Sequence, residues 1–429
     1  MSAKVILTVT QGQLKGTEYS FDDRDTCIIG RHSDCKIQIP NDKYHSSISR
    51  YHCLLDINPP NVRIRDFGSL HGTYVNGECI GKRDTNQKPS EKANLDLLEC
   101  DLKDGDEIRL ATTIFRVNIE QKSLITSTWI LSQLDPNLPS RIKFDRDRNL
   151  GSIRGYTKIK LLGKGGFGEV YLARFNYATG TRLVALKTLL PKVAVMPQMK
   201  QRFLREARGT KTLDHLNLIS LDDYGEENGI FFFTMEYCDR GSVADLLKKR
   251  GGKLPVTEAV EIILQVLDGL DYAHTEKGLV HRDIKPANIF LTVNKSKIVA
   301  KLGDYGLAKA FDLAGLSGQT MTGTAMGTPH FMPRQQVLEF KYAKPDVDIW
   351  AVAATLYFML TGAFPRDLTD KVNPMLEILT KPPVPIRQRD VSIPQTLAKI
   401  IDKALKDHPR LHFESAISFR QALVNSTLP

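Results

Sequence analysis

The feature that most constrains this chain is a short segment in which functional side chains are closely spaced. Residues 281–288 read H-R-D-I-K-P-A-N, which places a carboxylate at Asp283, an ammonium at Lys285 and an amide at Asn288. A second carboxylate follows at Asp304, which begins the triplet D-Y-G. The order and spacing of these four polar side chains limit both the chemistry and the fold that the chain can have.

These residue types fit the needs of phosphoryl transfer. That reaction requires a carboxylate to orient an attacking hydroxyl, a cation near the migrating group and oxygen ligands for a metal. In this order the two motifs resemble the catalytic and magnesium-binding loops of protein kinases, and the D-x-K-P-x-N form resembles serine/threonine kinases. The resemblance implies that Asp283 orients the substrate hydroxyl, that Lys285 stabilises the phosphoryl group, and that Asn288 and Asp304 hold Mg²⁺. Tyr305 replaces the more usual Phe, and we expect it to bias the position of this loop.

A glycine-rich stretch lies upstream, where residues 163–170 read G-K-G-G-F-G-E-V. The pattern is weak alone, because dinucleotide-binding folds share it. Here it continues into the strand-like residues 171–173, and V-A-L-K follows at 184–187, which resembles the first strands of a kinase and implies an ATP site. The residues implied to contact ATP are Leu162, Gly163, Gly165, Gly168, Val170, Ala185, Lys187, Met235, Glu236 and Cys238.

The same resemblance assigns roles to residues in two other segments. Glu206, in a predicted helix, is implied to form an ion pair with Lys187, and the alternative is a surface glutamate. Residues 306–335 correspond to the activation segment, in which Thr328 is implied to help position the substrate. The candidate phosphorylation sites are Thr320, Thr322 and Thr324.

The end of this segment departs from the kinase pattern. Where kinases have Ala-Pro-Glu, residues 333–335 read P-R-Q, so Gln335 takes the place of the glutamate. Its usual arginine partner corresponds to His412, in the stretch D-H-P-R-L-H-F, although a rival alignment assigns that role to Arg410. Losing one partner of a buried ion pair costs about 3–5 kcal/mol. We therefore predict that both partners changed together, and that Gln335 contacts His412.

The first 120 residues have a different pattern. Short β-rich runs alternate with clusters of Gly, Asn, Asp and Pro, which predicts a β-sandwich. The runs are found at residues 5–9, 27–30, 53–57, 62–65 and 114–117. The stretch from Lys82 to Lys103 is interpreted as a polar insertion.

Three motifs within this region carry a second resemblance. Gly30-Arg31 ends a predicted strand, residues 49–52 read S-R-Y-H, and residues 66–77 form a turn-rich loop that contains H-G-T. They resemble a forkhead-associated (FHA) domain, a family that binds phosphothreonine peptides. A guanidinium and a hydroxyl donor suit a phosphate dianion. The implied peptide-binding residues are Arg31, Ser49, Arg50 and His71, with His71 where the family often has Asn, and His52 is interpreted as a buried residue that braces the loops.

Charge and composition separate the two regions further. Residues 1–120 carry about 16 basic and 18 acidic side chains, so the net charge of +10 comes from the remainder. A basic domain could attract nucleic acid, but no nucleic-acid-binding motif accompanies the charge, and we expect no such partner. The sequence has no apolar run of about 18 residues and no secretory signal, which predicts a cytoplasmic protein without a membrane span.

The sequence thus predicts a multidomain protein: an all-β FHA sandwich over residues 1–120, a linker over 121–155 and an α+β bilobal kinase fold over 156–429. The lobes are expected at 156–237 and 238–429. The resemblance implies a serine/threonine protein kinase that uses ATP and Mg²⁺, acts on protein substrates, and binds phosphothreonine on partners or on its own segments. A homodimer is possible. The alternative is a pseudokinase scaffold that binds phosphothreonine proteins but does not phosphorylate threonine itself.

Overall fold

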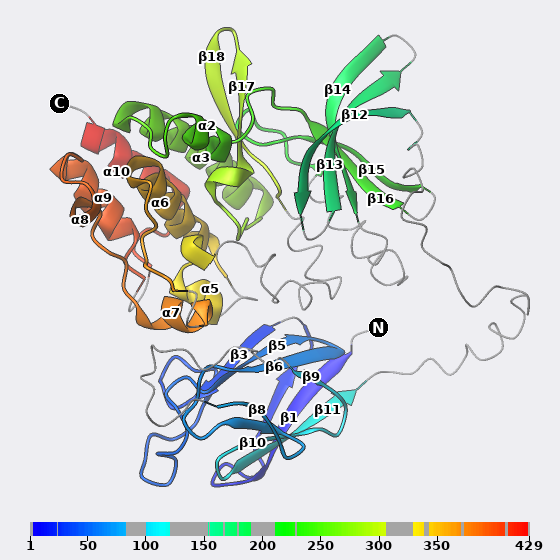
Figure 1. The fold of residues 1–429 in the computed structure, drawn as a ribbon, viewed down its shortest axis with the longest axis vertical. Coiled ribbons are helices and arrows are strands. Elements are labelled where there is room, and N and C mark those ends of the chain that lie inside the picture. Colours follow the sequence, from blue (N-terminus) through cyan, green and yellow to red (C-terminus); the bar gives the residue numbers. More distant parts are fainter. Residues whose placement is uncertain are drawn as a thin grey trace, which may run out of the picture.

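In a computed structural model of the protein, an N-terminal β domain lies against the larger lobe of a two-lobed C-terminal domain (Figure 1). The structure describes residues 3–23, 25–82, 100–120, 153, 155–165, 168–177, 180–189, 211–227, 230–305, 329–338, 343–369, 373–407 and 411–427. Within these residues, no helix combines the length and the apolar character that crossing a membrane requires.

The predicted β-sandwich is confirmed in the N-terminal domain. Its strands are β1 (Lys4–Gln11), β2 (Glu18–Phe21), β3 (Asp25–Gly30), β4 (Ile37–Gln38), β5 (Cys53–Asn58), β6 (Asn61–Asp66), β7 (Thr73–Val75), β8 (Glu78–Gly81), β9 (Cys100–Leu102), β10 (Glu107–Leu110) and β11 (Thr113–Glu120). One sheet has the order β2-β1-β11-β10-β7-β8 and the other β4-β3-β5-β6-β9. At the end of the stretch interpreted as a polar insertion, residues 100–102 form β9, which pairs with β6.

The small lobe of the C-terminal domain is an antiparallel sheet with the strand order β12-β13-β14-β16-β15. These strands are β12 (Tyr156–Gly165), β13 (Gly168–Tyr177), β14 (Gly180–Leu189), β15 (Leu221–Glu227) and β16 (Ile230–Glu236). The glycine-rich stretch joins β12 to β13, and the V-A-L-K run lies in β14. The sequence therefore predicted the strand context of both motifs correctly.

The large lobe is mainly helical. Its elements are α2 (Val243–Lys249), α3 (Val256–Lys277), β17 (Ile289–Asn294), β18 (Lys297–Leu302), α5 (Arg334–Leu338), α6 (Pro345–Thr361), α7 (Pro374–Thr380), α8 (Ile386–Arg389), α9 (Gln395–Ala404) and α10 (Ala416–Thr427). Helix α3 buries an apolar stripe, which includes Ile263 and Leu267. Helix α6 is buried almost all round, as expected for a helix that is apolar on every face. Together α3 and α6 form the core that supports the catalytic loop.

The two domains share a small apolar core. Successive side chains of a strand point to opposite faces. In β3 and β5, Cys27 and Leu55 face the sandwich interior, whereas Ile28 and Leu54 face outward and are still buried. They pack against apolar residues of the large lobe, among them Val337 of α5 and the buried side chains of α7. The outer face of this sheet is therefore covered by the large lobe (Figure 1).

Candidate functional site

The catalytic loop brings three of the predicted residues together. The Lys285 ammonium donates to both carboxylate oxygens of Asp283, at 3.0 and 2.8 Å. The Asn288 amide nitrogen donates to the Asp283 carbonyl at 2.7 Å and to its carboxylate at 3.0 Å. The Asp283 side chain keeps 25% of its surface exposed. The carboxylate is thus fixed in orientation and still accessible to a substrate hydroxyl.

The loop is anchored by Asp348, a fully buried carboxylate near the start of α6. It accepts from the backbone N–H groups of His281 and Arg282, both at 2.7 Å, and from His274 at 2.9 Å. Burial alone would raise the pKa of Asp348, but the hydrogen bond and charge of His274 hold it below its ordinary value. Arg282 is thereby kept at a φ of +68°, a conformation that non-glycine residues seldom adopt.

Asp304 lies beside this loop and faces the small lobe. Its carboxylate accepts from the Lys187 ammonium at 3.1 Å, and the preceding Gly303 N–H donates to the Asn288 carbonyl at 2.9 Å. Burial would raise the pKa of Asp304, but the Lys187 charge keeps it low. Asp304 itself has a φ of +61°. The arrangement presents an ionised carboxylate next to a cation, both held by the fold.

The same side chains suit a magnesium–nucleotide complex. The Asn288 nitrogen is used within the loop, so its amide oxygen is the atom that could bind a metal. With the ionised Asp304 it would supply two hard oxygen ligands, and nucleotide phosphates and water would supply the rest, as Mg²⁺ usually prefers. Among the described residues, no group of three or more His, Cys, Asp or Glu side chains is arranged to hold a metal ion.

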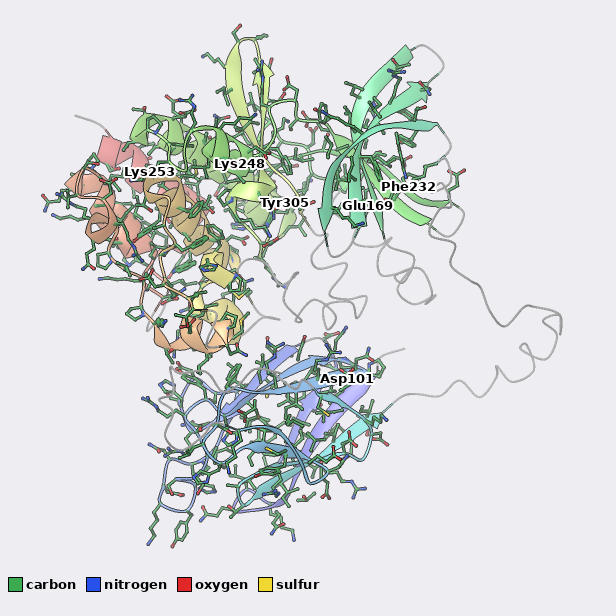
Figure 2. The ribbon with its side chains drawn as sticks, in the orientation of Figure 1. Asp101, Glu169, Phe232, Lys248, Lys253 and Tyr305 are labelled. Carbon is green, nitrogen blue, oxygen red and sulfur yellow. The ribbon has the colours of Figure 1, made fainter. Side chains whose placement is uncertain are left out.

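Tyr305 follows the metal-binding carboxylate and is 4% exposed. Its ring lies edge to face with His281, with centroids 4.6 Å apart, and burial raises the pKa of its hydroxyl well above the ordinary value. In Figure 2 it lies on the side of the large lobe that faces the small-lobe sheet. The ring packs as expected of a residue replacing Phe, while its predicted influence on loop position stays a prediction.

The residues implied to contact ATP line up across neighbouring strands. Val170 in β13 pairs with Lys187 in β14, and Ala185 pairs with Met235 in β16. Leu162 exposes 41% of its surface on β12. Strand β16 ends at Glu236, whose carboxylate pairs with Lys301 at 3.0 Å, and Cys238 follows it in the segment between the lobes. These strands place Lys187 next to Asp304. Apolar side chains of the residues implied to contact ATP lie along the same sheet.

Several predicted site residues lie outside the described residues. These are Glu206, Thr328 and the candidate phosphorylation sites Thr320, Thr322 and Thr324. The predicted ion pair between Glu206 and Lys187 therefore stays a prediction. The partner that the structure gives Lys187 is Asp304.

The contact that the structure describes for Gln335 differs from the predicted contact with His412. Its amide nitrogen donates to the backbone carbonyl of Asp407, five residues before His412. His412 is exposed, and its contact with Gln335 stays a prediction. A buried ion pair does lie close by, because Arg366, 1% exposed, binds the Asp407 carboxylate. Arg366 belongs to no motif and was not predicted from the sequence.

The predicted phosphopeptide residues lie on neighbouring loops of the N-terminal sandwich. The Arg31 N–H donates to the Ser49 carbonyl at 3.2 Å, which places the two side by side. His52 is fully buried, accepts from the Ser49 N–H at 3.0 Å and lies 3.2 Å from the Gly72 carbonyl. The interpretation of His52 as a loop brace is confirmed. Burial lowers the pKa of His52, which favours its neutral form.

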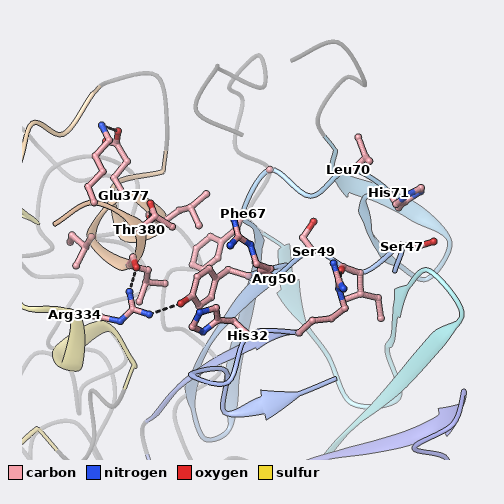
Figure 3. A pocket seen from close by; sticks show the side chains of 18 of the residues that line it. His32, Ser47, Ser49, Arg50, Phe67, Leu70, His71, Arg334, Glu377 and Thr380 are labelled. Atoms are coloured by element: carbon pink, nitrogen blue, oxygen red, sulfur yellow. Dashed lines mark hydrogen bonds and ion pairs between the residues drawn. The ribbon is translucent and has the colours of Figure 1, made fainter. Parts of the chain in front are cut away.

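Arg31, Ser49, Arg50 and His71 all line one cavity of about 700 Å³. Its opposite wall belongs to the other domain and includes Arg334 and residues 376–382 around the end of α7. Figure 3 shows Arg334, Glu377 and Thr380 on one side and Ser49, Arg50 and His71 on the other. The side of this cavity on the N-terminal domain was predicted from the sequence, whereas the other side was not.

Arg334 is the interdomain residue that the sequence most clearly failed to indicate. Its guanidinium donates to the Asp34 carboxylate, to the Tyr51 hydroxyl and to the Leu379 carbonyl, so it joins both domains. One signal in the sequence could have indicated this interface. Residues 27–29 and 53–55 are continuous apolar runs, which are typical of strands buried on both faces.

Two family models match the chain. The protein kinase domain model matches residues 156–421, and the FHA domain model matches residues 27–111. Among curated relatives, serine/threonine-protein kinase PknD of Mycobacterium tuberculosis is 36% identical over 265 residues, which cover 61% of this chain and 38% of PknD. PrkC of Bacillus subtilis is 33% identical over 263 residues, which cover 61% of this chain and 39% of PrkC. The chain thus spans about two fifths of these relatives' lengths.

Solved structures are similar as well. The PknI kinase domain of Mycobacterium tuberculosis has a TM-score of 0.50 at 26% identity, covering 65% of this chain and 98% of that chain. Rad53 1–466, solved in complex with AMP-PNP, has a TM-score of 0.50 at 22% identity and covers 98% of this chain and 99% of its own. At that identity the similarity to Rad53 concerns the fold alone.

Proposed function

The chain belongs to the protein kinase family, and on this basis we propose that it transfers the γ-phosphoryl group of ATP to serine and threonine hydroxyls of proteins. The observation that carries the proposal is the network around Asp283. Lys285, Asn288 and Asp304 are held within this network or beside it, and these are the groups that phosphoryl transfer requires.

Each residue has a defined part in the proposed mechanism. Asp283 accepts a hydrogen bond from the substrate hydroxyl, orients it for attack and takes its proton as the new bond forms. Lys285, already beside that carboxylate, stabilises the negative charge that develops on the transferred group. Lys187 binds the ATP phosphates, and Asn288 and Asp304 hold Mg²⁺. The metal, when bound, neutralises phosphate charge.

Arg31, Ser49, Arg50 and His71 are proposed to bind phosphothreonine. They lie on loops held by a buried histidine, so the donors are arranged before the ligand arrives. The ligand would be a phosphothreonine on a partner protein or on the chain's own segments, including Thr320, Thr322 or Thr324. Binding between two copies would favour a homodimer. A cytoplasmic location is part of the same proposal.

Mass spectrometry of the full chain after incubation with Mg²⁺ and ATP tests the catalytic proposal. The phosphatase-treated parent should gain phosphate on itself or on added generic protein substrates, while Asp283→Asn should not. Asp101→Asn, in the exposed ion pair of β9 with Arg63, is the matched control and should behave as the parent does. Equal phosphate gain in the parent and Asp283→Asn would overturn the proposal. Absence of transfer from the parent would leave the pseudokinase scaffold, which has no support among the kinase relatives.

A further inference from the structure

The cavity that contains the predicted phosphopeptide residues is built by both domains. Resting on the proposed phosphothreonine binding, we propose that the kinase large lobe supplies one wall of that site through the end of α7. A phosphothreonine peptide of a partner protein would then be recognised by the FHA loops and by Leu376, Thr380 and Pro382 together. The kinase domain would take part in choosing what the FHA domain binds.

The charges of the cavity favour an anionic ligand. Among the residues that the structure describes, the Arg31 guanidinium donates to two neutral acceptors, the Ile48 carbonyl and the Asn41 side chain. Arg50 is exposed and forms no ion pair among the residues that the structure describes. These two cations therefore retain their charge for a ligand, as a phosphate dianion requires.

The acidic side chains of the wall do not cancel this charge. Glu377 is bound by Lys381 and also accepts from the Thr369 N–H at 2.7 Å. Asp407 is bound by Arg366 and accepts from the Arg334 N–H at 3.0 Å. Each carboxylate is thus already neutralised by a lysine or an arginine of the kinase domain.

The two walls are held at a fixed separation. Arg334, whose side chain is 10% exposed, connects the Asp34 carboxylate and the Tyr51 hydroxyl to the Leu379 carbonyl. Tyr51 directly follows Arg50, and Leu379 directly precedes Thr380. Arg334 therefore connects the neighbour of Arg50 on one wall with the neighbour of Thr380 on the other wall (Figure 3). Because Ile28 and Leu54 also pack on this lobe, a ligand at Arg50 meets α7 in the folded chain.

The lining indicates which peptides would fit. A volume of about 700 Å³ is within the usual range for a ligand site and exceeds what a phosphate group alone needs. Beyond the two arginines, the FHA side contributes Leu70, and the kinase side contributes Leu376, Pro382 and the exposed Thr380. We expect selection for an apolar residue on one side of the phosphothreonine.

The test uses the full chain, treated with phosphatase so that its own phosphates do not compete. The probe is a peptide library with a fixed central phosphothreonine and degenerate flanking positions, beside the same library with unmodified threonine. Thr380→Trp fills the cavity from the kinase side. Thr396→Trp, at an exposed threonine on α9 that does not line the cavity, is the matched control.

The parent and Thr396→Trp should bind the phosphorylated library alike and select the same flanking residues. Thr380→Trp should bind at least ten-fold more weakly or lose that selection. Phosphate-dependent binding that Thr380→Trp leaves unchanged in strength and selection would overturn the two-domain site. Failure of the proposed function has a different signature, in which the parent shows no preference for the phosphorylated library, or Arg31→Ala keeps it.

Charge substitutions at Thr380 provide a second measurement that does not depend on filling the cavity. Thr380→Asp should weaken and Thr380→Lys should strengthen binding of the phosphorylated library, and both shifts should shrink as salt is raised. The unmodified library should respond less to either substitution. Shifts of the same sign for both variants, or none, would also overturn the proposal.

Discussion

Two buried charged side chains hold parts of this molecule together, and they do so in different ways. Asp348 lies in the large lobe and accepts hydrogen bonds from His274, His281 and Arg282 of that same lobe. Arg334 donates to Leu379 of its own lobe, but also to Asp34 and Tyr51 of the FHA domain. The first network is complete within one domain, whereas the second exists only while the two domains are docked.

This difference decides what each network can do. A carboxylate that accepts several hydrogen bonds in one domain fixes the catalytic loop whatever the other domain does. Undocking would leave the Arg334 guanidinium without two of its acceptors, and losing the partner of a buried charge is costly. Arg334 also starts the helix whose Gln336 donates to the Arg282 carbonyl at 2.8 Å. The docked FHA domain thus contacts a helix that itself touches the catalytic loop.

The largest effect is expected from removing the anchor that lies within one domain. Asp348→Ala leaves two backbone N–H groups and His274 without their acceptor in a fully buried site, which should cost about 3–5 kcal/mol of unfolding free energy. Urea unfolding of the full chain measures this loss. Asp346→Ala, at a partly exposed carboxylate two residues earlier, is the matched control and should lose far less. Equal losses would mean that Asp348 is not the anchor.

Breaking the interdomain network should have a smaller and more local effect. Arg334→Met keeps the apolar stem of the side chain but removes its donors, so docking should weaken by about 1–3 kcal/mol. Cys35 reports on docking, because burial in the shared apolar cluster raises the pKa of its thiol to about 12. Undocking should make Cys35 react faster with a thiol reagent, followed by mass spectrometry.

The controls for this experiment lie in the same chain. Cys27 and Cys53 belong to the sandwich interior and should stay unreactive in Arg334→Met, which excludes unfolding of the FHA domain. Arg389→Met removes an arginine paired with Asp367, away from the FHA domain, and should leave Cys35 protected. If Cys35 in Arg334→Met reacts as slowly as in the parent, the apolar cluster alone holds the domains together.

The same contrast explains what could be predicted from the sequence. The catalytic loop places Asp283, Lys285 and Asn288 within six consecutive residues, so their proximity follows from the chain itself. The strands of the sandwich were predictable from period-two patterns and turn residues.

Contacts between distant segments carried no comparable signal. Arg334 and Asp34 are separated by 300 residues, and nothing in a single sequence ties one charged residue to the other. Arg366 and Asp407 form a buried pair in the same way, 41 residues apart. The apolar runs in β3 and β5 indicated burial on both faces, but they could not identify the covering element.

Loss of the Asp34 charge should weaken docking of the two domains less than removal of the Arg334 side chain does. Burial would raise the pKa of Asp34, but the hydrogen bond and charge of Arg334 hold it below the ordinary value of 3.8. A lowered pKa in the folded state stabilises the docked form above pH 3.8, and that stability is lost only as the pH falls through the lower value. Asp34→Asn should therefore weaken docking by about 1 kcal/mol or less, as for a partly exposed ion pair.

The pH dependence separates this ion pair from its surroundings. From pH 8 to pH 5 Asp34 stays ionised, so the difference in urea midpoint between the parent and Asp34→Asn should not shrink. His32, whose Nδ1 lies 3.4 Å from the Asp34 carboxylate, can only add a favourable charge as the pH falls. Asp42→Asn, at a carboxylate on the FHA surface that pairs with His45, is a matched control outside the interface. A difference for Asp34→Asn that shrinks over this pH range would mean that Asp34 titrates within it and is not held by Arg334.

The smallest expected change in unfolding free energy concerns Gln335, which follows Arg334 in α5. If Gln335 and His412 take the places of an ion pair, Gln335→Glu should be destabilising alone, because a carboxylate cannot donate to the Asp407 carbonyl. Adding His412→Arg should then recover part of the loss. A coupling of about 0.5–1 kcal/mol in the double-mutant cycle, measured by urea unfolding, is what a direct contact predicts. Additive changes would place His412 out of reach, so that the Asp407 carbonyl and the buried Arg366–Asp407 pair would hold this end of the segment without it.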